Sequence, residues 1–340
     1  MKSFIIDLFG YEPRSIMVFG IGGGGDVVTA ATLALWIRRG TGRETYIGSI
    51  AWERFIVDPV PGPIPLNCFH EIKVVGEYSI VVNGDSIVER NGNKFKPQVA
   101  RVSGVVGEPV YVVDLWKGVS GFKKGLEELS DVLGLEAFIA VDVGGDVLAV
   151  GNEDNLWSPL ADSMGLAAFA SFKNSLLAVH GLGCDGELDQ NYLLSRIAAI
   201  AKKGGFITAK ALTKYEAWIL EKILEKSISE ASKLPLLAYK GFYGDYPIRN
   251  GSRIVKVTPV QAITFFLKTN IVYELSLLAK LVDNTTSLDE ANDKLNEKCI
   301  YTEFNLEKSL LIYKGMEIKG ELLNEIRRKG REKLCKDLLF

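Results

Sequence analysis

The sequence predicts a three-layer α/β fold in which helices cover both faces of a mostly parallel sheet. The first observation is an alternation, from residue 15 to about residue 202, of short apolar segments and longer segments with helical spacing. Such alternation is typical of parallel strands joined by right-handed crossovers. The second observation is composition, because 47% of the 340 residues are hydrophobic, which is ample for a substantial core.

The first strand, first helix and second strand are predicted between residues 15 and 50. Segment 15–21 (SIMVFGI) is an apolar strand, segment 27–37 (VVTAATLALWI) is a buried helix, and segment 45–50 (TYIGSI) is the second strand. A glycine-rich turn joins the first strand to the helix, so the arrangement is Rossmann-like. Three prolines within residues 58–63 exclude regular structure in the loop that follows.

Residues 72–108 have a different pattern, which predicts an antiparallel β-hairpin insertion. Four short β-like runs, at 72–75, 79–82, 87–90 and 99–106, are separated by turn residues. Two of the separating turns contain Asn-Gly, at residues 83–84 and 91–92, and Asn-Gly between apolar runs favours a hairpin.

The alternation resumes after residue 108 and becomes less regular beyond residue 204. We expect a Rossmann-like core over residues 1–204, and a mainly helical C-terminal α/β extension over residues 205–340 packed on the same core. Segment 270–281 fits either a strand or a helix. The other expected strands are 110–115, 137–143, 176–180 and 253–258. The other expected helices are 121–133, 158–171, 190–202, 210–229, 259–267, 287–297 and 317–338.

Charge, cysteines and hydropathy exclude several classes of protein. The formal net charge of −2 gives no footprint for nucleic acid. Four cysteines lie far apart without a C-x-x-C pair, which argues for free thiols in a reducing compartment. No apolar run reaches eighteen residues and no signal peptide is present, so we expect a cytoplasmic protein that does not bind membranes. The tryptophans and other aromatics favour a homo-oligomer.

A run of four glycines followed by an aspartate is the most specific local motif. Gly20, Gly22 and Gly25 fit the G-x-G-x-x-G spacing of nucleotide-binding turns, and Gly23 and Gly24 complete the run. The turn places a ligand against a helix N-terminus. Asp26 would repel a bare phosphate, so either a metal lies between them or the ligand is not anionic there.

Acidic residues follow the ends of five predicted strands. In a parallel sheet these ends share one edge, where ligands bind. A divalent metal, a lysine such as Lys117 or a cationic substrate would neutralise the cluster. With only two histidines in the chain, oxygen ligands suit magnesium, manganese or calcium better than zinc or copper, and we expect magnesium or manganese. The acids are Asp26, Glu53, Asp58, Asp114, Asp142, Asp146, Asp185 and Glu187.

Several of these residues also fit simpler roles. Glu53 lies where dinucleotide-binding folds place the acid that binds the ribose, or it pairs with Arg54. His180 fits a core histidine at a strand end, and Cys184 has no base nearby in the sequence. Asp142 and Asp146 flank the turn Gly144-Gly145, which fits either a metal site or a capped glycine turn.

Three segments together resemble the mainly archaeal domain-of-unknown-function family numbered 1152. They are FGIGGGGDVVTA, WERFIVDPVPGP and VDVGGDVLAVGNEDNLWSPLADSMGLAA, within a resemblance over roughly residues 10–310. The resemblance implies an α/β protein whose residues of the three segments form one common functional site. The family has no agreed activity. Its residues would be Gly22 to Asp26, Glu53, Arg54, Asp58, Asp142, Gly144 to Asp146, Asn152, Glu153 and Asp162.

These observations favour a metal-dependent enzyme acting on a small phosphorylated or nucleotide-like molecule, by hydrolysis or phosphoryl transfer. Asp26, Asp142 and Asp146 would hold the metal, and Asp185 and Glu187 would be catalytic. The alternative is a sensor that binds a nucleotide or dinucleotide without turnover. Residues expected to bind the ligand are Gly20, Gly22, Gly23, Gly24, Gly25, Glu53, Arg54, Asp58, Gly144, Gly145, Asn152, Glu153 and Asp162.

Overall fold

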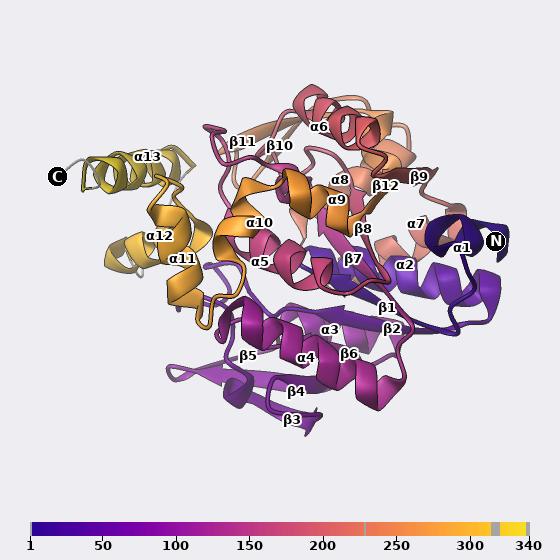
Figure 1. Cartoon of the computed structure of the whole chain (residues 1–340). Coiled ribbons are helices and arrows are strands. Elements are labelled where there is room, and N and C mark those ends of the chain that lie inside the picture. The colour runs from indigo at the N-terminus through magenta and orange to yellow at the C-terminus, as the bar shows by residue number, and fades with distance from the viewer. Residues whose placement is uncertain (1, 228, 314–319, 338–340) are drawn as a thin grey trace.

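A computed structural model describes residues 2–227, 229–313 and 320–337 (Figure 1). Across these residues the chain forms a ten-stranded sheet in the order β3-β4-β6-β2-β1-β7-β8-β12-β9, with β5 paired to β4, and a separate hairpin β10-β11. The strands are β1 (Ser15–Gly20), β2 (Glu44–Ser49), β3 (Phe69–Val74), β4 (Ser79–Arg90), β5 (Asn93–Phe95), β6 (Val110–Val113), β7 (Ala137–Val143), β8 (Ser175–His180), β9 (Phe206–Ala211), β10 (Gly244–Ile248), β11 (Arg253–Val257) and β12 (Ile263–Lys268). The α-helices are α1 (Lys2–Phe9), α2 (Asp26–Thr41), α3 (Gln98–Val106), α4 (Gly118–Leu133), α5 (Pro159–Ala170), α6 (Gln190–Lys202), α7 (Lys214–Leu224), α8 (Glu230–Tyr239), α9 (Thr269–Leu275), α10 (Leu277–Val282), α11 (Leu288–Asn296), α12 (Glu303–Leu310) and α13 (Gly320–Asp337).

The centre of the sheet is parallel and both sides are antiparallel. Strands β6, β2, β1, β7 and β8 run in one direction. Strand β4 is antiparallel to β6 on one side, and β12 is antiparallel to β8 on the other. The predicted fold class is therefore confirmed, and strands β9 and β12 of the C-terminal half belong to the same sheet as β1.

Helices cover both faces of the sheet, which gives three layers (Figure 1). The alternation of side chains along β1 shows the two faces, because Ile16 and Val18 pack into one core and Met17 and Phe19 into the other. The first core includes residues of α2, α3, α7 and α8, and the second includes residues of α4, α5, α6 and α10. Helices α11, α12 and α13 lie together at the side of the molecule away from α1 (Figure 1).

The predicted insertion at residues 72–108 is only partly antiparallel β structure. Strands β3, β4 and β5 form it, and Asn91-Gly92 makes the turn between β4 and β5. The expected hairpin at Asn83-Gly84 is wrong, because both residues lie within β4, whose pairing with β3 is interrupted there by a bulge of residues 83–86 opposite Glu71. The expected strand at 99–106 is wrong too, since α3 lies there. One contact explains both errors: a Cβ on Gly84 would lie 2.7 Å from the Cα of Gly104 in α3, so Gly84 permits close packing of helix on strand.

Two further sequence predictions beyond residue 204 need correction. The expected helix at 210–229 is strand β9 followed by α7, and Ser229 caps α8. The expected helix at 259–267 is a short 3-10 turn (Pro259–Ala262) followed by β12, whose side chains ITFFLK are β-branched or aromatic at four of six positions. Segment 270–281 is helical. The expected terminal helix at 317–338 is α13, and residues 317–319 and 338 lie outside the described residues.

None of the helices among the described residues is long and apolar enough to cross a membrane. The four cysteines are free thiols, and Cys184 is the buried one.

Candidate functional site

A cavity of about 550 Å³ opens at the C-terminal edge of the parallel strands. Loops after β1, β2, β7 and β8 line it, together with the N-terminal turn of α5, the β10–β11 turn and α12. This is the edge at which the sequence places the acids. Asp26, Glu53, Asp142, Asp146, Asp185 and Glu187 all line the cavity, whereas Asp58 and Asp114 do not.

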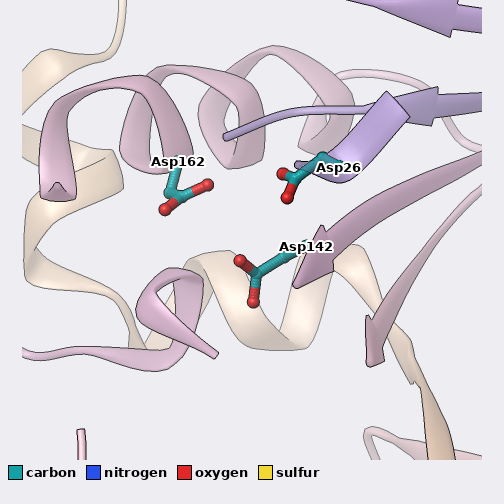
Figure 2. A group of neighbouring side chains, drawn as sticks. All are labelled: Asp26, Asp142 and Asp162. Carbon is teal, nitrogen blue, oxygen red and sulfur yellow. The ribbon is translucent and has the colours of Figure 1, made fainter. Parts of the chain in front are cut away.

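Three aspartates from three different elements converge on the floor of this cavity (Figure 2). Asp26 begins α2, Asp142 lies near the end of β7, and Asp162 lies in the first turn of α5. One carboxylate oxygen of each lies within 4.8 Å of the other two, and all three side chains are buried. Oδ2 of Asp142 and Oδ1 of Asp162 have no hydrogen-bond partner among the described residues. Buried oxygens without partners are costly, so this arrangement calls for a cation or a ligand.

The glycine loop lies against these carboxylates. The backbone N–H of Gly22 donates to Oδ2 of Asp26 at 2.5 Å. A Cβ on Gly22 would lie 2.4 Å from Oδ1 of Asp162 and 2.7 Å from Oδ2 of Asp26. Gly20 lies in β1 rather than on the cavity surface, and a Cβ there would lie 2.7 Å from the carbonyl carbon of Asp26. The glycines therefore allow the first strand, the loop and the carboxylates to approach one another closely.

The electrostatics of the three aspartates follow from burial and from their mutual repulsion. Burial raises the pKa of Asp26 to about 8, against opposing hydrogen bonds from the backbone N–H groups of Gly22 and Val143, and the charge of Asp185 adds to the rise. Burial raises the pKa of Asp142 and the pKa of Asp162 well above the usual range of an aspartate, and the charges of neighbouring acids add to the rise. A cation among these oxygens would favour the ionised forms instead.

A second acidic group adjoins the first. Ser158 Oγ lies 2.9 Å from Oδ2 of Asp146 and 2.8 Å from Oε1 of Glu187. Oδ1 of Asp146 is buried without a partner among the described residues. Oδ1 of Asp185 accepts from the Glu187 N–H at 2.9 Å, and burial raises the pKa of Asp185 to about 6.

Glu187 is held by several donors. It accepts from the N–H groups of Trp157 and Ser158 at 2.6 and 3.0 Å, and Arg253 pairs with it at 3.2 Å. Burial would raise the pKa of Glu187, but Arg253, Asp146 and these backbone donors outweigh burial and lower it. Glu187 is thus ionised, and it positions the chain that enters α5.

Two glutamates of α12 were missed by sequence reasoning. Glu303 accepts from the N–H groups of Leu160 and Ala161 at 3.0 and 2.8 Å, in the first turn of α5. Glu307 accepts from the indole N–H of Trp52 at 3.0 Å, and both glutamates line the cavity. The local sequence around these glutamates shows only the capping box at the start of α12. A capping box does not indicate a contact with α5, whose Ala161 precedes Glu303 by 142 residues.

Glu53 and Arg54 line the cavity without pairing with each other. Glu53 Oε1 accepts from the N–H of Gln98 at 2.5 Å, and burial raises the pKa of Glu53 to about 7. Arg54 instead pairs with Glu230 at 3.0 Å, so the ion pair considered for Glu53 and Arg54 is not formed. Arg101 also lines the cavity.

The remaining predicted site residues lie outside the cavity lining. Asp58 forms a buried ion pair with Arg90 at 2.6 Å. Glu153 accepts from the N–H groups of Val150 and Gly151 at 2.7 Å each, in a turn that also contains Asn152. Gly144 and Gly145 have φ of 126° and 113°. A Cβ on Gly144 would lie 1.8 Å from Oδ2 of Asp185, so this glycine lets the β7 loop pack on Asp185.

His180 and Cys184 have core positions. His180 is 1% exposed, and its Nδ1 lies 2.9 Å from Oγ1 of Thr264. Burial, and then the charge of Lys210, lower the pKa of His180 to about 3.

Asp114, at the end of β6, accepts from the N–H of Trp116 at 2.8 Å.

Residues 17–311 match the family described as protein of unknown function (DUF1152). The chain belongs to this family. The resemblance seen in the sequence is thereby confirmed, and the description of DUF1152 assigns no activity. No curated protein and no solved structure matches the chain. Function must therefore be argued from the cavity itself.

Proposed function

We propose that this DUF1152 protein is a metal-dependent enzyme that acts on a small phosphorylated or nucleotide-like molecule, by hydrolysis or phosphoryl transfer. The observation that supports it best is the convergence of Asp26, Asp142 and Asp162, whose oxygens lie within 4.8 Å of one another. The three residues come from separate elements, and two of them retain a buried oxygen without a partner among the described residues. Carboxylate oxygens are the ligands that magnesium and manganese prefer.

Each part of the cavity has a role in this proposal. A divalent ion on the three aspartates would offset charge on a phosphoryl group during its transfer. Asp185, whose pKa burial raises to about 6, would take up or release the proton. Glu187 and Glu303 hold the first turn of α5 through four backbone N–H groups and so fix the position of Asp162. The glycine loop lets the ligand approach the start of α2.

A binding protein without turnover is the second candidate. It is favoured by Glu53, which lines the cavity just after β2, where dinucleotide-binding folds place the acid that binds the ribose. Thermal shift measurements with NAD, ATP and AMP separate the two candidates. Stabilisation that requires Mn²⁺ or Mg²⁺ favours the enzyme, and stabilisation that does not require a metal favours the sensor.

The direct test is calorimetric titration of chelator-treated protein with Mn²⁺ and Mg²⁺. We expect the wild type to bind one ion and the Asp142→Asn and Asp162→Asn variants to lose at least tenfold in affinity. Asp114→Asn is the matched control, because Asp114 also ends a parallel strand but lies outside the cavity lining. Unchanged metal binding in both cavity variants would refute the proposal. A phosphatase and nucleotidase screen with the metal-loaded protein then tests turnover, which Asp185→Asn should abolish.

A further inference from the structure

The side of the cavity formed by the β10–β11 hairpin carries positive charge. Arg54 comes from the loop after β2, Arg249 from the β10–β11 turn, and Arg253 from the start of β11, and all three line the cavity. They lie close enough that the charges of Arg253 and Arg54, after burial, help to lower the pKa of Arg249 to about 10. Two acids adjoin this arginine group, Glu187 and Glu230. A third acid lies near the group, because the charge of Arg253 also acts to lower the pKa of Asp185.

The donors of these arginines are only partly used. Arg253 donates from Nη1 to the Asp185 carbonyl at 2.7 Å and lies over the ring of Trp157 at 4.3 Å. Its Nε is buried without a partner among the described residues, and the side chain is 9% exposed. Arg249 reaches Glu230 only at 3.9 Å, and its guanidinium makes no hydrogen bond within the described part of the chain. Partly buried guanidinium groups normally find acceptors, so these donors indicate an acceptor that the described residues do not supply.

The hairpin turn is built to hold Arg249 at this place. Arg249 and the next residue, Asn250, have φ of 54° and 55°, which is a left-handed conformation that glycine or asparagine normally occupies. Glu230 Oε1 accepts from the backbone N–H of Arg249 at 3.0 Å and so fixes the turn from α8. Glu230 therefore holds the backbone of Arg249 beside the cavity, and the Arg249 side chain lines the cavity with only the 3.9 Å contact to Glu230 as an ion pair.

We propose that Arg54, Arg249 and Arg253 form a phosphate-binding subsite, separate from the aspartates that would hold the metal. This inference rests on the proposed function and narrows its substrate to a molecule whose phosphate group binds without help from a metal. The rigid forks of arginine match the oxygens of a phosphate, and three of them can contact a tetrahedral oxyanion from different directions.

The test is calorimetric titration with inorganic phosphate and pyrophosphate in the presence of a chelator. We expect the wild type to bind one of them, and Arg249→Gln and Arg54→Gln each to raise the Kd by at least tenfold. Arg249→Lys should restore affinity only in part, because lysine keeps the charge and loses the fork. Arg14→Gln is the control, since Arg14 is 89% exposed, pairs with Glu136 and lies outside the cavity lining. Far-UV circular dichroism verifies that each variant is folded.

Three results would overturn the subsite. The first is a wild type that binds neither anion at millimolar concentration. The second is an Arg249→Gln variant that binds as tightly as Arg14→Gln. The third is acetate that competes as well as phosphate, which would make the ligand a carboxylate. The Asp162→Asn variant separates the phosphate test from the metal hypothesis. It should lose Mn²⁺ binding but still bind phosphate in the presence of a chelator. Loss of phosphate binding in the arginine variants supports the subsite even if no variant or wild type binds metal.

Discussion

Replacing Gly22 by alanine is the sharpest perturbation of the candidate metal site, because it adds one methyl group and removes no ligand. The new Cβ would lie 2.4 Å from Oδ1 of Asp162 and 2.7 Å from Oδ2 of Asp26. Both oxygens belong to the proposed metal ligands. The methyl group would therefore push at least one carboxylate away from the other two.

The size of the effect follows from this overlap. Real Cβ atoms essentially never lie within 3.0 Å of another heavy atom, so Asp162 must move by at least about 0.6 Å. Metal–ligand distances tolerate only about 0.2 Å, and lesser disturbances around metal ligands cost about 10–100-fold in affinity. We expect Gly22→Ala to weaken Mn²⁺ binding by about 10–100-fold, which corresponds to roughly 1.4–2.8 kcal/mol.

Gly24→Ala is the matched control in the same loop. A Cβ on Gly24 would meet only the Trp52 carbonyl oxygen at 3.5 Å, an ordinary contact, and its φ is not left-handed. Calorimetric titration of both variants with Mn²⁺ is the assay, with thermal melting to verify folding. The reasoning is refuted if Gly22→Ala binds Mn²⁺ like the wild type, or if Gly24→Ala loses as much affinity.

Two further predictions concern buried groups outside the cavity lining. Asp58→Asn should lower the free energy of unfolding in urea by about 3–5 kcal/mol, because it leaves the buried Arg90 without its ionic partner, while Mn²⁺ affinity should stay unchanged. A loss below 1 kcal/mol would contradict this. His180 is held neutral by burial, with its pKa lowered to about 3 from about 6.5 unfolded, so its contribution to stability is complete above pH 6.5 and falls as the pH drops toward 3. Between pH 7 and pH 4.5 the wild type should lose about 2.5 kcal/mol more than His180→Asn, measured as unfolding free energies, and equal losses would refute this.

The parallel centre of the fold was predictable because its signal is local. Each strand is a continuous apolar run, and each is followed by a turn and a helix with regular spacing. The rule that ligands bind at the carboxyl ends of parallel strands then brings Asp26 and Asp142 together without any knowledge of side-chain contacts. The valine-rich α3 shows the limit, since its composition favours a strand, whereas it forms a helix between Pro97 and Gly107 that packs closely on β4 through Gly84.

The rest of the site depends on contacts that the sequence does not encode locally. Asp162 lies on a helix that returns to the floor of the cavity, and only the family resemblance places it there. Glu303, Arg249 and Arg253 come from the C-terminal third of the chain. Several helices and strands predicted beyond residue 204 differ from those that the structure contains. Glu303 and Arg253 contact partners more than 60 residues away in the sequence, such as Glu187 for Arg253, and Arg249 contacts Glu230 on the preceding helix. No motif or period marks such pairs.

The balance of charge gives the strongest reason to expect a cation at the aspartates. Two unit charges 4.8 Å apart repel by about 3.5 kcal/mol at an effective dielectric constant near 20. Three such pairs sum to about 10 kcal/mol, which is comparable to the total stability of a typical domain. Burial and mutual repulsion raise the pKa of Asp26, Asp142 and Asp162, and protonation is the way in which the carboxyl groups escape this cost when no cation is bound. If these side chains had only a structural role, asparagine would fill it without the free-energy cost of ionisation. Three aspartates at this place are therefore best explained by a divalent ion that replaces their protons.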